Sequence, residues 1–424
     1  MSELHHLLTL PTRPITEEYV TKLRHFLESG IPATYTLEQA AEYERELQSG
    51  PVQNKTDSAS ASDSEQANSN TTPLHILARS LPTDLSPEEL QVVLTLMNTL
   101  FEYGAGWNFV DYENKTVGDL LLEKGQPRDG VLYSRLVEAG VSAELLLRKV
   151  NGAEVEFLDM GAEDLQDNYT NTGAPVEQSE ELASHTDGSN TNRNDSGHSA
   201  DAAGDQNTFL KTKLEYHDGT LTTKDAKDGV MMDWETDIMK LAAKTILSSS
   251  SPSEAVVLNI GFGMGIIDTF IQEAHPLKHY ICEAHPDVLA KMKADGWYDK
   301  PNVVVLEGRW QDSLNKLLDK GDVFFDGVYY DTFSEHYEDM LDLYDVIVGL
   351  LKPEGIFSFF NGLGADRPLC YDVYKRIVEL DLAQYGLKCE FTILNIGKSL
   401  PDWKEVNRSY FNCDYYYHPS IHFA

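Results

Sequence analysis

In the second half of the chain, short apolar runs alternate with segments whose apolar residues recur at helical spacing. The clearest helical patterns lie at 340–351 and 371–385. Apolar runs bounded by turn residues are typical of buried strands, and alternation of strands with helices produces a parallel sheet covered on both faces. We therefore predict an α/β fold with a doubly wound sheet. Its strand candidates are 255–260, 278–283, 302–306, 325–330 and 355–360.

Two further β-prone runs, 388–395 and 409–418, follow with no helical pattern between them. We expect them to add an antiparallel hairpin at one edge of the sheet. Five alternating units and a final antiparallel pair resemble the Rossmann-like class I methyltransferase architecture more than the six-stranded dinucleotide fold.

The N-terminal region has an internal repeat. The pattern apolar-x-x-apolar-apolar-Glu-x-Gly occurs at 23–30, 97–104 and 133–140, and it predicts helix ends stopped by glycine. Thr72-Pro73 resembles the turn that opens an ankyrin repeat, whose period is about 33 residues. We predict an all-α region of two to three ankyrin-like units. Such a stack either binds a protein or only caps its neighbour.

Two polar segments divide the chain. Residues 51–71 and 164–207 contain mostly Ser, Asn, Asp, Thr and Ala, so little apolar burial is available to offset chain entropy. We predict that both are disordered. The expected organisation is an ankyrin-like region over 1–163 with a polar insert, a linker over 164–207, and a methyltransferase domain over 208–424.

Composition restricts the class of partner. With 34 basic against 69 acidic residues, the net charge of −35 opposes nucleic-acid binding and suits a basic partner, although acidic insertions that only aid solubility give the same charge. No membrane span, signal peptide or cysteine cluster for zinc is recognisable. We expect a monomer with reduced thiols in the cytoplasm, and nuclear entry is left open.

The candidate site begins where the first strand of the sheet ends. The apolar run 256–260 leads into Gly261, Gly263 and Gly265, a pattern typical of a tight turn that opens a helix. Glu283 ends the next strand, where a carboxylate can accept both hydroxyls of a ribose. The two features together predict a nucleoside site at the carboxyl ends of the strands.

Other strand ends supply candidate chemistry. The segment 307–312 follows the third strand, where methyltransferases hold adenine, and Asp331 ends the fourth strand, although it could be a helix N-cap. Upstream, 230–239 has helical spacing. Its Trp and Met residues are ordinary core candidates, but Glu235 could bring a second carboxylate to the site.

Four motifs, 229–235, 259–264, 308–312 and 329–332, together resemble guanidinoacetate methyltransferases. That resemblance covers about 208–424. The combination with an ankyrin-like half resembles the fungal type IV protein arginine methyltransferases, which methylate the delta nitrogen of arginine in a protein.

The resemblance implies S-adenosylmethionine as donor, no metal, and a basic, ribosomal protein as substrate docked by the ankyrin-like half. It implies that Glu283 holds the ribose, that Trp310 and Gln311 meet the adenine, and that Glu235 and Asp331 bind the guanidinium. The implied donor-binding residues are Tyr216, Met231, Met239, Gly261, Phe262, Gly263, Met264, Gly265, Ile266, Ile267, Glu283, Ala284, His285, Trp310, Gln311 and Asp331.

Two carboxylates suit this chemistry. A guanidinium is always protonated and its nitrogens are poor nucleophiles, while carboxylates bind its planar fork and can accept the released proton. We expect Asp331 to accept the proton and Glu235 to orient the substrate. The segment 333–336 departs from the Tyr-Pro-Leu of guanidinoacetate methyltransferases, and its acid favours a basic protein chain as substrate.

Three alternatives stay open at this point. They are a small-molecule guanidino methyltransferase, a donor-binding scaffold without activity, and, more remotely, a nicotinamide oxidoreductase. The glycine spacing and the last strand pair oppose the oxidoreductase.

Overall fold

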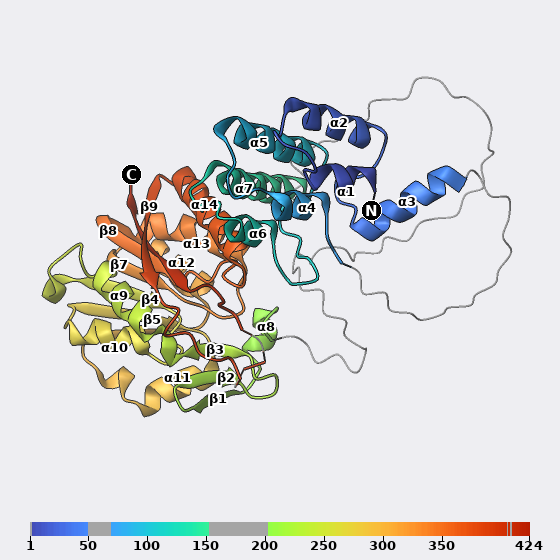
Figure 1. Cartoon of the computed structure of the whole chain (residues 1–424). Helices are drawn as coiled ribbons and strands as arrows, with labels where there is room; N and C mark the ends of the chain where they lie inside the picture. The colour runs from blue at the N-terminus through green and yellow to red at the C-terminus, as the bar shows by residue number, and fades with distance from the viewer. Residues whose placement is uncertain (1, 50–68, 152–201, 405, 408) are drawn as a thin grey trace, which may run out of the picture.

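The computed structural model describes residues 2–49, 69–151, 202–404, 406–407 and 409–424. A stack of helices from the first half of the chain lies against one side of a helix-covered sheet from the second half (Figure 1).

Most of the two segments predicted to be disordered lies outside the described residues. At their ends the prediction is wrong, because residues 69–71 and 202–207 have defined contacts. Ser69 donates from its amide to Glu38 at 3.2 Å, and the short helix α8 (Gln206–Phe209) begins inside the predicted linker.

The central sheet has the order β6-β5-β4-β7-β8-β10-β9, in which only β10 runs antiparallel to its neighbours. The intervening helices pack on its two faces. The strands are β4 (Val256–Ile260), β5 (Lys278–Glu283), β6 (Val303–Glu307), β7 (Phe325–Tyr330), β8 (Leu351–Phe359), β9 (Leu387–Asn395) and β10 (Tyr415–Phe423). The helices are α9 (Thr236–Ile246), α10 (Ile266–Glu273), α11 (Pro286–Ala294), α12 (Trp310–Lys320), α13 (Tyr337–Leu350) and α14 (Pro368–Gln384).

Neighbouring side chains of a central strand point to opposite faces. Val257 of β4 packs in a cluster with residues of α9 and α10, whereas Leu258 packs in a cluster with residues of α12, α13 and α14. Because both faces are covered, four of its five residues are apolar, as the sequence pattern predicts, and the buried Asn259 is the exception. The parallel strands and the two helices predicted at 340–351 and 371–385 are confirmed.

The last strand pair extends one edge of the sheet as an antiparallel pair, as predicted. β10 is the inner strand of the pair, with Ile421 opposite both Phe357 of β8 and Cys389 of β9. The strand begins at Tyr415, however, later than predicted. Residues before it form a loop, because Phe411 and Cys413 pack into a separate buried cluster instead of pairing.

A small three-stranded sheet precedes the large one and has no clear signal in the sequence. It consists of β1 (Leu214–His217), β2 (Thr220–Thr223) and β3 (Gly229–Met232), each four residues long. The prediction of a helix over 230–239 is therefore wrong for its first half. Met231 pairs with Leu221 in the sheet, a 3₁₀ turn (Asp233–Glu235) follows, and the helix starts only at Thr236.

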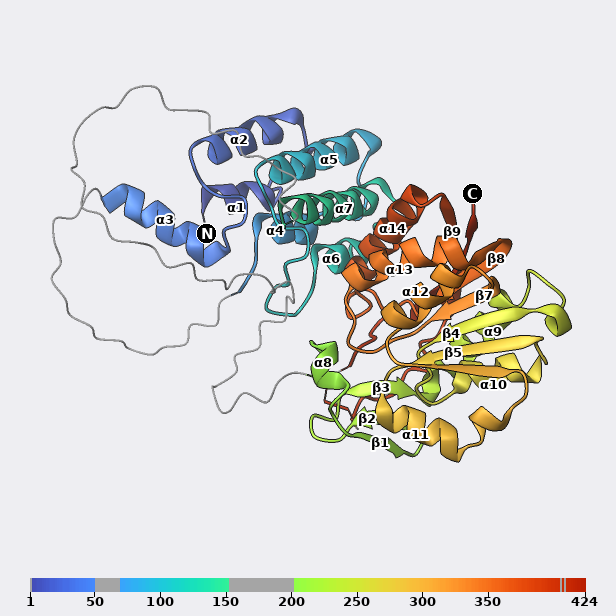
Figure 2. The ribbon, with the colours of Figure 1, turned by 180° about the vertical axis from the view of Figure 1, so that it is seen from behind.

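The N-terminal half forms three stacked helix pairs, which continue onto α14 of the C-terminal half. In both views of the ribbon, α6 and α7 lie beside α14 (Figures 1 and 2). The pairs are α1 (Glu3–Leu8) with α2 (Glu17–Glu28), α4 (Pro73–Ser80) with α5 (Pro87–Glu102), and α6 (Val117–Glu123) with α7 (Val131–Asn151), and α3 (Leu37–Ser49) stands apart.

Two of the three predicted glycine stops are confirmed. Gly30 and Gly104 follow helices and have φ of 97° and 82°. The third is wrong, because Gly140 lies in the middle of α7. A Cβ there would meet Val373 Cγ2 at 2.6 Å and Trp107 Cε3 at 2.9 Å, so this glycine lets α7 approach α14 closely.

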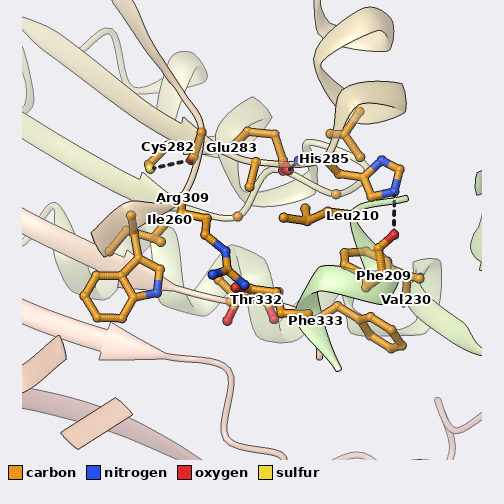
Figure 3. A pocket seen from close by; sticks show the side chains of 18 of the residues that line it. Phe209, Leu210, Val230, Ile260, Cys282, Glu283, His285, Arg309, Thr332 and Phe333 are labelled. Carbon is orange, nitrogen blue, oxygen red and sulfur yellow. Dashed lines mark hydrogen bonds between the residues drawn. The ribbon is translucent and has the colours of Figure 1, made fainter. Parts of the chain in front are cut away.

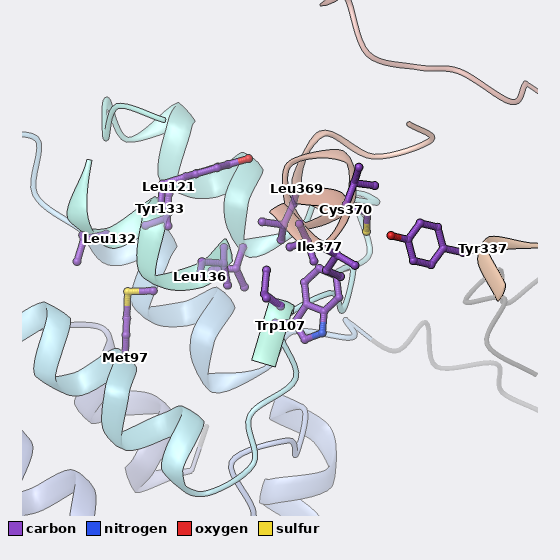
Figure 4. Packing of buried hydrophobic residues seen from close by; sticks show 14 of the residues in the cluster. Met97, Trp107, Leu121, Leu132, Tyr133, Leu136, Tyr337, Leu369, Cys370 and Ile377 are labelled. Carbon is purple, nitrogen blue, oxygen red and sulfur yellow. The ribbon is translucent and has the colours of Figure 1, made fainter. Parts of the chain in front are cut away.

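Two buried acids of α14 connect the halves. Asp372 accepts hydrogen bonds from Tyr133 at 2.7 Å and from Arg128 at 3.1 Å, and Asp381 pairs with Arg148 at 2.8 Å. Around them an apolar core runs continuously from the helical stack to α14, with Leu136 among its members (Figure 4). The stack is thus fixed to the C-terminal half by burial and by paired charges.

Three features considered from composition can be examined in the structure: the cysteines, membrane-spanning helices and metal-ligating clusters. All four cysteines are free, and Cys282, Cys370 and Cys413 are buried. Among the described helices, none has the length and apolar character needed to cross a bilayer. Nor do the described residues bring together three His, Cys, Asp or Glu side chains suited to a metal ion.

Candidate active site

A pocket opens at the carboxyl ends of β4, β5 and β7, where the sequence predicts it (Figure 3). It brings together eight of the predicted site residues from distant segments. They are Met231, Gly261, Gly263, Glu283, Ala284, His285, Trp310 and Asp331.

The glycine loop is closely packed against the fourth strand's end. Gly261 has φ of 91°, and a Cβ on it would lie 1.8 Å from the carbonyl oxygen of Asp331. Gly263 (φ 53°) is approached by the side chain of Met231, whose Cε would be 2.8 Å from an added Cβ. Only glycine fits both places, because each combines a left-handed backbone with a near neighbour.

Glu283 is held by backbone amides at the end of β5. Its Oε2 accepts from Phe262 N at 2.8 Å and its Oε1 accepts from His285 N at 2.6 Å. Burial raises the pKa of Glu283, and these amide hydrogen bonds act against the rise. Each oxygen retains a lone pair, so the oriented carboxylate can accept the hydroxyls of a ribose.

His285 anchors α8 to the pocket. Its Nε2 lies 3.1 Å from the carbonyl oxygens of Phe209 and Thr212, and its Nδ1 accepts from Asp287 N at 3.2 Å. Burial lowers the pKa of His285, which favours the neutral ring with its proton on Nε2. The Phe209 ring then packs against Phe333 with centroids 4.7 Å apart, so α8 lies along one side of the pocket.

Glu335 faces inward, although the sequence led us to expect the acid of segment 333–336 to favour a basic protein chain. Rather than facing a basic chain, its carboxylate accepts from Trp310 Nε1 at 3.0 Å and from Gln206 Nε2 at 2.5 Å. The other donors are Gln311, the Tyr330 hydroxyl and the Thr332 hydroxyl. The left-handed turn at Ser334 (φ 63°) directs the acid inward.

Asp331 presents a carboxylate without a partner. Its amide donates to Ile260 O at 2.9 Å, but its buried Oδ2 has no hydrogen-bond partner among the described residues. Burial, followed by the charge of Asp268, raises the pKa of Asp331 to about 7. A buried, unpaired carboxylate in a pocket is well suited to a cationic ligand.

Glu235 lies beside Asp331 but does not line this pocket. Its Oε1 accepts hydrogen bonds from the Tyr410 hydroxyl and from Met232 N at 3.4 Å. Burial and then the charge of Asp331 raise the pKa of Glu235 well above its usual range. The charge of Asp331 therefore favours the protonated form of Glu235, and a cation bound between the two acids would favour their ionised forms.

Some predicted donor-binding residues support the pocket from behind instead of lining it. The Tyr216 hydroxyl donates to Gly263 O at 3.1 Å, and the Phe262 ring turns toward Trp297, with centroids 5.1 Å apart. Met239 is fully buried in the core beneath α9, so the prediction that it packs on the donor is not supported. The other predicted donor residues outside the lining are Met264, Gly265, Ile266, Ile267 and Gln311.

Sequence reasoning also missed several lining residues. Thr332 and Phe333 directly follow Asp331, and Phe209-Leu210 is an apolar pair at the end of a polar segment, so local signals existed. Arg309 extends into the pocket toward Thr332, and its Nε has no hydrogen-bond partner among the described residues (Figure 3). The remaining missed residues are Gln206, Val230, Ile260, Cys282, Val288 and Gly308.

The pocket fits S-adenosylmethionine, the donor that this fold implies. Left-handed glycines allow a ligand close to the backbone, and the Glu283 carboxylate is oriented for a diol. The unpaired carboxylate of Asp331 offsets the charge of a sulfonium. All three features suit a cationic nucleoside.

The sheet order, with one antiparallel strand inserted next to the last, and this pocket define a class I S-adenosylmethionine-dependent methyltransferase. Residues 203–418 match the family model of guanidinoacetate N-methyltransferase. The whole chain is 64% identical to protein arginine N-methyltransferase 2 of Candida glabrata and 63% identical to that of Saccharomyces cerevisiae, with 100% of each chain covered. The chain belongs to the protein arginine N-methyltransferase 2 family, so the predicted resemblance is confirmed.

Proposed function

We propose that this enzyme transfers a methyl group from S-adenosylmethionine to the delta nitrogen of an arginine in a basic, ribosomal protein. The observation that carries the proposal is a pair of neighbouring acids, the half-buried Asp331 with its unpaired Oδ2 in the pocket and the buried Glu235 beside it. Relatives named protein arginine N-methyltransferase 2 support arginine as the acceptor. The delta nitrogen and the ribosomal substrate rest on the resemblance to type IV enzymes.

The residues divide the work as follows. Bound donor supplies an electrophilic methyl group. Glu283 holds the ribose, and Trp310 lies where the adenine is expected. Asp331 binds the guanidinium and accepts the proton that leaves as the nitrogen is alkylated, because it lines the pocket and its Oδ2 has no hydrogen-bond partner among the described residues. Glu235 fixes the orientation of the planar cation.

Protein substrates are favoured over small ones by two features. The helical stack is fixed to α14 by partly buried ion pairs, which gives a docking surface a constant position relative to the pocket. The net charge of −35 attracts basic partners. A small guanidino substrate is the second candidate, because the catalytic half matches the guanidinoacetate N-methyltransferase model.

The test is a comparison of acceptors with labelled S-adenosylmethionine. The full chain is incubated with purified basic ribosomal proteins and, separately, with guanidinoacetate. Label in protein, located on the delta nitrogen by fragmentation mass spectrometry, is expected. Label only in guanidinoacetate overturns the proposal, and label on a terminal nitrogen overturns the delta assignment. The Asp331→Asn variant should bind donor and transfer nothing. The cytoplasmic location and the monomeric state stay predictions.

A further inference from the structure

Tyr410, in the loop between β9 and β10, makes a contact that the roles above do not use. Its hydroxyl donates to Glu235 Oε1 and accepts from Trp234 Nε1 at 3.0 Å. Its ring packs against Trp403, with centroids 4.8 Å apart, and lies over Gly229, where a Cβ would approach its Cε1 to 3.1 Å. The loop thus places the Tyr410 hydroxyl within an aromatic cluster, in direct contact with the buried Glu235 carboxylate.

We infer that Tyr410 is a positioning residue for arginine methylation, which fixes the Glu235 carboxylate so that its second oxygen faces the guanidinium. The inference rests on the proposed function and extends it to the β9–β10 loop.

The direction of the hydrogen-bond chain follows from the groups present. An indole N–H can only donate, so Trp234 occupies an acceptor position of the Tyr410 oxygen. Burial and the charge of Glu235 raise the pKa of Tyr410 well above its usual range, so the phenol keeps its proton. That proton is directed to Glu235.

The two oxygens of Glu235 are therefore unequal. Oε1 receives both the Tyr410 hydroxyl and Met232 N. No donor among the described residues bonds to Oε2. A carboxylate tied at one oxygen loses rotational freedom, and the other oxygen is left for a cationic N–H at little further entropic cost.

Tyr410 also acts on the charge of Glu235. Four titratable groups surround this acid: Asp331 after β7, Tyr329 on β7, Tyr416 on β10 and Tyr410. The charge of Asp331 raises the pKa of Glu235, whereas the hydrogen bond from Tyr410 lowers it. Loss of the hydroxyl should therefore make Glu235 harder to ionise when substrate arrives.

The experiment compares Tyr410→Phe with Tyr417→Phe in the full chain. Tyr417 is the matched control, because its buried hydroxyl donates to a buried carboxylate, Asp372, at 2.6 Å, remote from the pocket. Methyl transfer to basic ribosomal proteins is measured across pH, and donor affinity is measured by calorimetry. For Tyr410→Phe we expect turnover to fall about tenfold or more, since a hydrogen bond to a charged group is lost. Donor affinity should stay within about twofold.

The pH profile and a double variant separate positioning from mere packing. In Tyr410→Phe the acid limb of the rate profile should move to higher pH, and in Tyr417→Phe it should not. If Tyr410 acts through Glu235, adding Tyr410→Phe to Glu235→Gln should cause no further loss. Additive losses, or an unmoved acid limb, overturn the inference. Wild-type enzyme that labels no arginine overturns the proposed function instead.

Discussion

The carbonyl oxygen of Asp331 lies only 1.8 Å from the position that a Cβ on residue 261 would occupy. The two residues follow adjacent parallel strands, β4 and β7, and the amide of Asp331 donates to Ile260 O. The backbone of the glycine loop therefore packs directly against the backbone of the acid proposed to accept the proton. A side chain at 261 cannot be accommodated without moving Asp331.

Gly261→Ala should abolish methyl transfer and weaken donor binding. The positive φ alone costs about 1–2 kcal/mol for a residue with a Cβ. The overlap with Asp331 adds at least a comparable amount, so donor affinity should fall by about a hundredfold or more. Gly386→Ala is the control, because its φ is 71° but no atom lies within 4 Å of an added Cβ. Normal donor affinity in Gly261→Ala would contradict the described packing.

Donor binding should release a proton near neutral pH. The free enzyme holds the pKa of Asp331 at about 7. A bound sulfonium favours the carboxylate and lowers that pKa. At a pH between the pKa values of the free and the donor-bound enzyme, a proton therefore leaves Asp331 when the donor binds. Donor affinity should therefore rise with pH and level off above about 7. Calorimetry in buffers of different ionisation enthalpy measures the released proton.

The release should vanish in Asp331→Asn, which has no proton to lose at this site. Glu235→Gln distinguishes the two acids. If that variant, and not Asp331→Asn, loses the proton release, then Glu235 is the group that titrates and the assignment of Asp331 is wrong.

Glu335→Gln should loosen the side of the pocket formed by α8. The carboxylate accepts five side-chain donors, and an amide at the same place would present N–H groups to some of them. Loss of a charged acceptor costs about 1.5–3 kcal/mol, so donor affinity should fall about tenfold or more. Trypsin should also cleave faster at the exposed Lys211, which follows α8. The exposed Glu338, changed to Gln, is the control; equal cleavage of the two variants contradicts this role.

The parallel sheet could be predicted because its central strands β4 and β7 are largely buried on both faces and are therefore rich in apolar residues. The small sheet could not, since its strands have four residues each and pair only with one another. The start of β10 was predicted too early, because the aromatic residues before it resemble a strand. In the structure, Phe411 instead packs against Trp234 with centroids 5.6 Å apart.

The same distinction holds for the site. Gly261, Glu283 and Asp331 lie at the carboxyl ends of strands, so the periodicity places them together. Glu335 and Tyr410 depend on the course of loops, which no periodic pattern determines. Glu335 turns inward directly after a left-handed residue, and Tyr410 reaches Glu235 across 175 positions of sequence.

Gly140 offers a test of how the halves are joined. In an exposed helix, changing glycine to alanine stabilises by about 1 kcal/mol. Here an added Cβ meets Val373 and Trp107, and overpacking of this kind costs about 1–3 kcal/mol, so Gly140→Ala should lower the free energy of unfolding. Gly349→Ala in α13 is the control, because its nearest neighbour is only the flexible tip of Leu318. Urea denaturation measures both variants.

The same variant tests the link to function. If the stack docks the protein substrate, Gly140→Ala should raise KM for basic ribosomal proteins and leave donor affinity unchanged, because α7 shifts relative to α14 while the pocket stays intact. An unchanged KM together with reduced stability would assign the stack a capping role only. Stability equal to that of Gly349→Ala would contradict the close approach of the two helices.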